Sequence, residues 1–161
     1  MKNVIVLIMG LCAACSVYAG EAKVNFKDFN EYRDVYPSNE VKGAYHKRLA
    51  KQFERHIVKL AEQLPQGYKL DVTFNDIDLA GDARFSMNDV RIVKPIYFPR
   101  LNIRYRLVNE KGEQVLKTQE RELKDMSFMD RIKVGRNEAL YYEKRLLNEW
   151  FDKDVLATAK I

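Results

Sequence analysis

Cysteine is nearly absent from this 161-residue chain, because its only two, Cys12 and Cys15, lie within the first 19 residues. If that segment is removed, no thiol remains for a disulfide, a zinc site or nucleophilic attack. Histidine is also scarce, with His46 and His56 alone. Ten helical residues would place these two about 15 Å apart, too far to share a metal or a proton. Mechanisms based on cysteine or on paired histidines are therefore excluded.

The sequence also lacks an apolar run of the roughly 20 residues that a membrane-spanning helix needs. Its longest run, Val4–Cys15, follows Lys2 and precedes a small-residue end at Ala19. A basic start, a short apolar stretch and a small-residue cleavage site are typical of a secretory signal. We expect residues 1–19 to be a cleaved signal peptide, and the mature protein to be periplasmic or secreted, without a transmembrane segment.

A second way of processing the N-terminus stays open. Ala13 and Ala14 precede Cys15, as in the cleavage site of a lipoprotein, whose cysteine becomes the acylated N-terminus. Cys12 stands where such sites usually have leucine. The alternative to free export is thus an envelope protein anchored through Cys15.

Charge of neither sign dominates: 28 basic and 23 acidic residues give +5, and loss of Lys2 leaves +4. This mild excess favours an anionic surface component or an envelope protein as partner, and the absence of a basic cluster argues against nucleic acid. No linker rich in glycine, serine or proline interrupts residues 20–161. That length makes a single secreted domain, whose oligomeric state the sequence does not indicate.

Hydrophobic spacing predicts the first strand and the first helix. Residues 22–27 alternate apolar and polar side chains, which indicates a strand. After Ser38, a natural N-cap, apolar side chains recur every three or four residues until Pro65 and Gly67 end the pattern. This amphipathic helix presents Val41, Tyr45, Leu49, Phe53, Ile57, Leu60 and Leu64.

The remaining segments predict strands and a second helix. Residues 68–74 form a strand whose phase slips at residues 75–76, which suggests a bulge or the end of pairing. Residues 90–93 form a short strand before Pro95, and residues 99–122 form a hairpin. Residues 137–152 form a helix with Trp150 and Phe151 as core anchors. We expect an α+β two-layer sandwich: an antiparallel sheet of four to five strands, with two helices packed on one face.

The hairpin carries one strongly basic face. Leu101, Ile103, Tyr105 and Leu107 alternate with polar residues, so the opposite face presents the arginines. Glu120 and Glu122 return on the second strand and are expected to face them. We interpret this row as a candidate ligand-binding surface formed by Arg100, Arg104 and Arg106.

Three aspartates, Asp76, Asp78 and Asp82, occur in the stretch FNDIDLAGD. A calcium loop laid on them fails at Ala80, which has no side-chain oxygen, and at Met87, where a glutamate should complete the shell. We therefore favour a structural role, with bonds to Arg84, Arg91 and backbone amides. Metal binding by these aspartates remains an alternative.

The stretches FNDIDLAGDARF, RIVKPIYFPRLNIRYRLVNEKGE and YYEKRLLNEWF, with the earlier VNFKDFNEYRDV, resemble a family of small secreted bacterial proteins known as domain of unknown function 3016. The similarity covers nearly the whole mature chain. The D-x-D-L-A-G-D stretch and Tyr97-Phe98-Pro99-Arg100 are its most specific parts. The resemblance implies an envelope location and brings no activity, cofactor or catalytic residue.

No nucleophile stands in a recognised catalytic setting, and no phosphate-binding glycine loop occurs. We therefore expect a non-catalytic periplasmic binding or interaction module that uses no cofactor. The alternatives are a metal-dependent enzyme that uses Asp76, Asp78 and Asp82, and a lipid-anchored envelope protein. Whether the chain is an enzyme is thus left open, with the balance against it.

Overall fold

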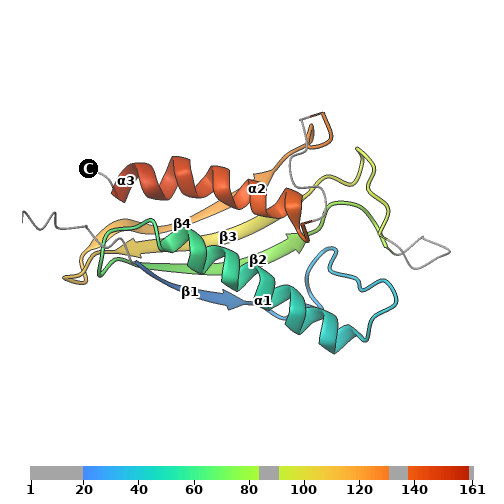
Figure 1. Ribbon diagram of the computed structural model, residues 1–161, viewed down its shortest axis with the longest axis horizontal. Helices are drawn as coiled ribbons and strands as arrows, with labels where there is room; N and C mark the ends of the chain where they lie inside the picture. The colour runs from blue at the N-terminus through green and yellow to red at the C-terminus, as the bar shows by residue number, and fades with distance from the viewer. Residues whose placement is uncertain (1–19, 84–90, 131–137, 160–161) are drawn as a thin grey trace, which may run out of the picture.

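The computed structural model describes residues 20–83, 91–130 and 138–159. These residues form an α+β domain with a four-stranded sheet and two main helices (Figure 1). In chain order, the elements are β1 (Glu21–Phe26), α1 (Lys42–Ala61), β2 (Lys69–Asp78), β3 (Arg100–Val108), β4 (Gln114–Lys124), α2 (Tyr141–Trp150), the π-helical segment η1 (Phe151–Leu156) and α3 (Ala157–Ala159). None of the helices within the described ranges has the length and apolar character needed to cross a bilayer.

The sheet is mixed, with the strand order β1-β2-β3-β4. Strands β2, β3 and β4 are antiparallel neighbours, whereas β1 runs parallel to β2. The prediction of a purely antiparallel sheet was therefore wrong. The reason is α1, whose 20 residues carry the chain from the end of β1 back to the start of β2, as a crossover between parallel strands requires.

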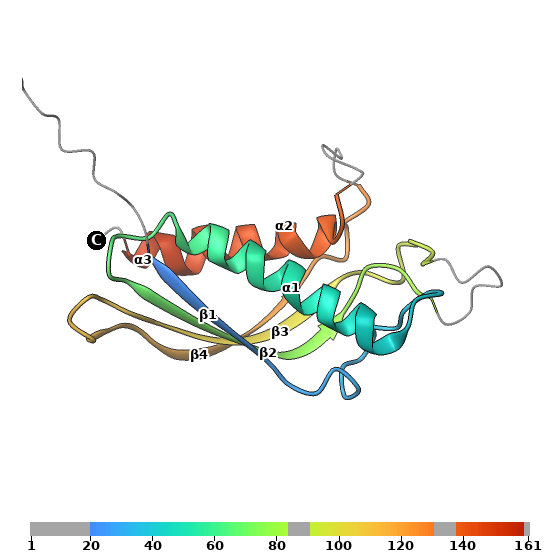
Figure 2. The ribbon, with the colours of Figure 1, turned by 60° about the horizontal axis from the view of Figure 1, so that its bottom comes forward.

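Both helices lie on the same side of the sheet (Figure 2). Alternate strand residues point to that side, since successive side chains in a strand face opposite ways. The hydrophobic core lies between the helices and the sheet, where α1 contributes Leu49, Phe53 and Ile57. The sheet contributes Leu70, Val72, Phe74, Leu101, Ile103, Tyr105 and Leu107.

The first helix begins later than the sequence predicts. Its N-cap is Val41, which makes no side-chain capping bond, so the prediction of Ser38 as N-cap was wrong. Val41 itself is 77% exposed and does not join the apolar face. The helix ends at Ala61, and Pro65 and Gly67 follow in a turn, as expected.

The strand predictions mostly agree with the structure. The phase slip in β2 is a register shift between Phe74 and Asp76, after which pairing with β3 continues to Asp78. The hairpin is confirmed as β3 and β4. No strand forms in the described part of residues 90–93, where Ile92 makes only an isolated bridge with Asp82; residue 90 lies outside the described residues.

The second helix begins at Tyr141 and is prolonged through η1 and α3. Trp150 and Phe151 are both buried against the sheet, which confirms them as core anchors. In η1, Asp154 accepts hydrogen bonds from the Tyr105 hydroxyl and the Arg121 Nε. These two bonds fix the end of the second helix to β3 and β4.

Candidate functional site

The side of the sheet opposite the helices, here called the outer face, is polar. On β3 it carries Arg100, Asn102, Arg104 and Arg106, because the alternate residues are buried in the core. On β2 it carries Asp71 and its neighbours Thr73, Asp76 and Asp78. The structure thus brings the three predicted arginines and two of the predicted aspartates onto one face.

The three arginines are not equivalent. Arg106 Nε donates to Asp71 Oδ2 at 2.7 Å, and Arg100 Nε lies 3.6 Å from Glu122 Oε1. The Arg100 guanidinium also lies 4.9 Å from the centre of the Phe98 ring. For Arg104, no carboxylate oxygen of the described residues comes within 4.0 Å, although Glu120 is its register partner on β4. Arg104 is therefore the arginine of this row that is available to a ligand.

Arg104 borders a hollow of about 310 Å³ on the outer face, here called the sheet hollow. Two cross-strand rows form it: Lys23, Asp71 and Arg106 in one, and Asn25, Thr73 and Arg104 in the next. Thr118 of β4 and Tyr105 also line it. With three cations and one carboxylate, the sheet hollow has a net charge of +2.

The predicted aspartates lie in two different surroundings. Asp76 accepts a hydrogen bond from the Arg33 backbone N–H at 2.8 Å, and its carboxylate lies 3.6 Å from the Arg33 guanidinium. Asp78 lies 3.7 Å from the same guanidinium, and burial raises the pKa of Asp78. Asp82 is buried beyond the end of β2, where its backbone pairs with Ile92.

The structure tests the expected partners of Asp76 and Asp78 only. Asp76 and Asp78 bind an arginine and a backbone amide, but the arginine is Arg33. Arg84 lies outside the described residues, and Arg91 is paired with Asp34. No group of three or more metal-ligating side chains occurs in the described part of the chain. Metal binding by Asp76, Asp78 and Asp82 stays a prediction.

A buried ion pair that the sequence did not reveal holds the loop before α1 against the end of β2. Asp34 is 2% exposed, and the Arg91 guanidinium donates to both of its carboxylate oxygens, at 2.9 and 3.2 Å. Arg91 also donates to the carbonyls of Gly81 and Tyr36. Burial lowers the pKa of Arg91, but the hydrogen bond and charge of Asp34 raise it by more. Sequence spacing gave no signal, since 57 residues separate the pair.

The N-terminal end of α2 lies near the C-terminal end of β2 (Figures 1 and 2). Residues at these two ends line a second cavity, which the sequence did not reveal. It measures about 530 Å³ and is here called the Glu143 cavity. Glu143 is 3% exposed, and its Oε1 accepts a hydrogen bond from the Ala80 backbone N–H at 2.7 Å. Burial raises the pKa of this carboxyl. A single glutamate within an amphipathic helix carries no distinctive sequence signal.

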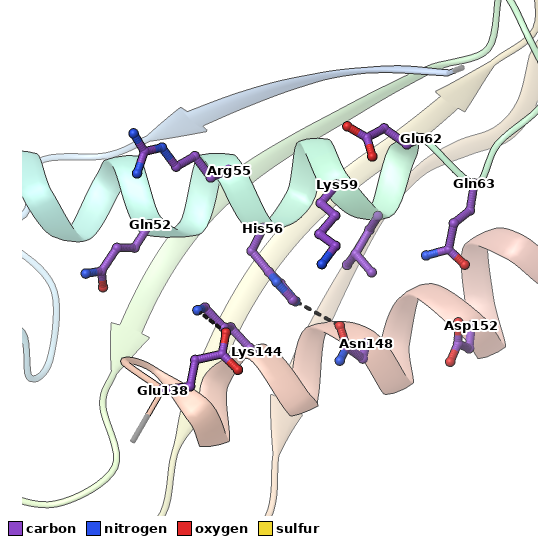
Figure 3. A pocket seen from close by; sticks show the side chains of 11 residues that line it. Gln52, Arg55, His56, Lys59, Glu62, Gln63, Glu138, Lys144, Asn148 and Asp152 are labelled. Atoms are coloured by element: carbon purple, nitrogen blue, oxygen red, sulfur yellow. Dashed lines mark hydrogen bonds and ion pairs between the residues drawn. The ribbon is translucent and has the colours of Figure 1, made fainter. Parts of the chain in front are cut away.

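A broader groove of about 830 Å³ separates α1 from α2 (Figure 3). Within it, His56 Nε2 and Asn148 Oδ1 lie 2.8 Å apart, and Lys144 Nζ contacts Glu138 at 2.5 Å. Burial lowers the pKa of His56. The groove contains three basic side chains, Arg55, Lys59 and Lys144, and three acidic ones, Glu62, Glu138 and Asp152. It therefore has no net charge with which to select a ligand.

The fold and these surfaces define an α+β domain with a mixed sheet and a polar outer face. The sequence model of the family described as "Protein of unknown function (DUF3016)" matches residues 20–153. The chain therefore belongs to that family, as the sequence motifs suggested. The curated proteins contain no match to this chain.

Proposed function

We propose that the protein is a non-catalytic binding module of the bacterial envelope, which holds an anionic surface component on the outer face of its sheet. The observation that supports this proposal is the sheet hollow, where Lys23 and Arg104 both lack a carboxylate within 4.0 Å among the described residues. The remaining cation, Arg106, is paired with Asp71. An anion placed between Lys23 and Arg104 would provide the missing counter-charge.

The surroundings of Arg104 suit phosphate or carboxylate groups. Arginine presents a planar set of donors that matches such groups, and Lys23 adds a second positive charge. Thr73, Thr118 and Asn25 add hydroxyl and amide donors around the hollow. Because each of these residues lies on a paired strand, their backbone positions are fixed before a ligand arrives.

The proposal includes a two-layer arrangement in which the helices cover one side of the sheet and leave the outer face to the partner. It also includes export, with cleavage near Ala19, and keeps acylation at Cys15 as the alternative. Residues 1–19 lie outside the described residues. The mass of the mature N-terminus distinguishes the two: free export gives a chain that begins near Gly20, whereas acylation gives a chain that begins at a lipid-bearing Cys15.

Binding of the mature protein to lipid vesicles of two compositions tests this proposal. Vesicles of phosphatidylcholine that contain phosphatidylglycerol should bind the protein, and pure phosphatidylcholine vesicles should not. The double variant Lys23→Gln/Arg104→Gln should lose most of this binding, about 1 kcal/mol for each cation near an anionic surface. Binding should also weaken as salt is added, because exposed charges are screened.

A matched control separates the sheet hollow from overall charge. The double variant Lys51→Gln/Arg55→Gln removes the same two charges from exposed positions on α1. It should bind the anionic vesicles almost as well as the wild-type protein does. Equal losses of vesicle binding in both double variants would show that binding depends only on net charge. Failure of the wild-type protein to bind either lipid composition would refute the proposal.

A further inference from the structure

The Glu143 cavity lies on the other side of the sheet from the sheet hollow and has a different chemical character. Its walls come from Tyr45 of α1, from Leu79 and Ala80 just after β2, from Arg91 and Val93, and from Glu138 and residues 140–143 at the start of α2. Leu140, just before α2, has φ 58° and ψ 34°. That left-handed conformation is rare for a residue with a branched side chain. It places Leu140 in the cavity wall beside Glu143.

Among the residues that the structure describes, Glu143 has no basic partner of its own. In the described part of the chain, no lysine or arginine nitrogen lies within 4.0 Å of its carboxylate, and Ala80 provides a neutral donor. The two cations whose charge reaches it, Arg91 and Lys144, bind Asp34 and Glu138 respectively. A buried ionised carboxylate without a counter-ion is costly. Burial therefore favours the neutral carboxyl in the free protein, and a cation bound beside Glu143 would supply the counter-charge that its ionised form lacks.

The walls suit an organic cation better than a bare metal ion. Tyr45 and Tyr141 both line the cavity and add aromatic surface, which attracts cations. The Arg48 guanidinium already lies 5.2 Å from the centre of the Tyr45 ring, and that of Arg145 lies 6.0 Å from the centre of the Tyr141 ring. Tyr142 packs edge-on against the buried ring of Phe128, with ring centres 4.7 Å apart, which fixes its position. Leu79, Val93 and Leu140 add apolar surface for the body of a ligand.

We propose that the Glu143 cavity is a second binding site, which takes a primary amine carried on an apolar or aromatic body, with the ammonium group against the Glu143 carboxylate. The ammonium donates hydrogen bonds to the carboxylate, and the tyrosines and aliphatic side chains enclose the rest. This site is separate from the sheet hollow, so either can fail without the other.

Binding at this site is coupled to the release of a proton. In the free protein, burial raises the pKa of Glu143 and so favours its protonated form. The ammonium favours the ionised form, so the proton leaves as the amine binds, and affinity rises with pH through the titration of Glu143. The charged and titratable groups that face the carboxyl from the packed elements are Tyr45, Arg91, Glu138, Tyr141, Tyr142 and Lys144.

The test is isothermal titration calorimetry with two probes of similar size, phenethylamine and 2-phenylethanol. Phenethylamine should bind the wild-type protein at least about tenfold more tightly than the neutral alcohol. Glu143→Gln should reduce phenethylamine binding by at least about tenfold and leave 2-phenylethanol unchanged. Asp152→Asn, which removes one charge from the neighbouring groove outside this cavity, serves as the matched control and should change neither affinity by more than about twofold.

Proton release gives a measurement that needs no variant. Titrations of the wild-type protein in buffers of different ionisation enthalpy should show that protons are released as the amine binds, and that their number falls as the pH is raised through the titration of Glu143. Equal affinity for the amine and the alcohol would overturn the proposal. So would amine binding without proton release, or amine affinity that Glu143→Gln leaves intact.

Discussion

Replacement of Arg91 by methionine tests whether the buried ion pair with Asp34 holds the loop before α1 in place. The change keeps an unbranched apolar side chain of similar length but removes four hydrogen bonds, two to Asp34 and one each to the carbonyls of Gly81 and Tyr36. It leaves Asp34 in a site that is 2% exposed, without a counter-ion. The free energy of unfolding should fall markedly as a result.

The expected loss follows from this burial. Removing one partner of a buried ion pair costs about 3 to 5 kcal/mol. We expect the lower end, about 3 kcal/mol, because the Arg91 side chain is 19% exposed and water can partly replace it. For a domain of about 140 residues, that loss lowers Tm by roughly 10 °C.

Urea denaturation and thermal melting of four proteins measure this effect: wild type, Arg91→Met, Asp34→Asn and the double variant. Since Asp34→Asn removes the charge that Arg91 balances, the double variant should cost less than the two single changes added together, with a coupling of about 1 to 3 kcal/mol. Arg33→Gln is the matched control from the same loop. Its side chain is 49% exposed, and its ion pairs measure 3.6 and 3.7 Å, so it should cost less than about 1 kcal/mol. A cost below about 1 kcal/mol for Arg91→Met, or additive effects in the cycle, would refute the reasoning.

Three further predictions concern single side chains. Burial raises the pKa of Glu143 above its ordinary value of 4.5. The free energy of unfolding of the wild-type protein should therefore fall as the pH rises from about 4.5 through the folded-state pKa of Glu143. Chemical denaturation at several pH values should show that Glu143→Gln removes this part of the pH dependence. Tyr32→Phe removes a hydroxyl that donates to the Phe74 carbonyl and accepts from the Lys27 N–H. Urea denaturation should show a loss of about 1 to 3 kcal/mol in the free energy of unfolding, and no loss would contradict a stabilising role for these two hydrogen bonds. Gly81→Ala should lower Tm, because Gly81 has φ 84° and a Cβ there would lie 2.7 Å from the Ile92 carbonyl oxygen; an unchanged melting curve would show that the turn relaxes without cost.

Periodicity was enough to predict most elements of the fold. Alternation in the strands and three-to-four spacing in the helices depend on which side chains face the core, and the core residues of α1 and β3 follow those patterns closely. The prediction of Ser38 as N-cap was wrong because the chain reaches helical geometry only at Lys42, after a loop whose path is set by tertiary contacts. The prediction of a strand at residues 90–93 was wrong for the described residues, where Arg91 forms an ion pair with Asp34 and only Ile92 makes a β-bridge.

The parallel pairing of β1 was missed although the sequence contained a signal for it. A strand, a 20-residue helix and a second strand, in that order, are typical of a crossover between parallel neighbours. Alternation within β1 shows only which side chains face inward. It carries no information on which strand lies beside it or in which direction that strand runs.

The binding surfaces were predicted unevenly. The arginine row was found because its residues alternate within one strand, but the availability of Arg104 depends on Asp71 and Glu122, which lie on two other strands. Lys23 joins the same hollow through the parallel pairing of β1 that was missed. The Glu143 cavity and the Asp34–Arg91 pair each depend on residues more than 50 positions apart, which no local pattern specifies.

The most direct test of the account is a nuclear magnetic resonance titration of the isotope-labelled mature protein with glycerol phosphate, the anionic part of the phosphatidylglycerol headgroup. If the outer face binds anions, amide and side-chain signals of Lys23, Thr73 and Arg104 should shift in a saturable manner, and the Lys23→Gln/Arg104→Gln variant should lose those shifts. Saturable shifts confined to the helices, or none at all, would contradict the proposal that this face of the sheet binds an anionic partner.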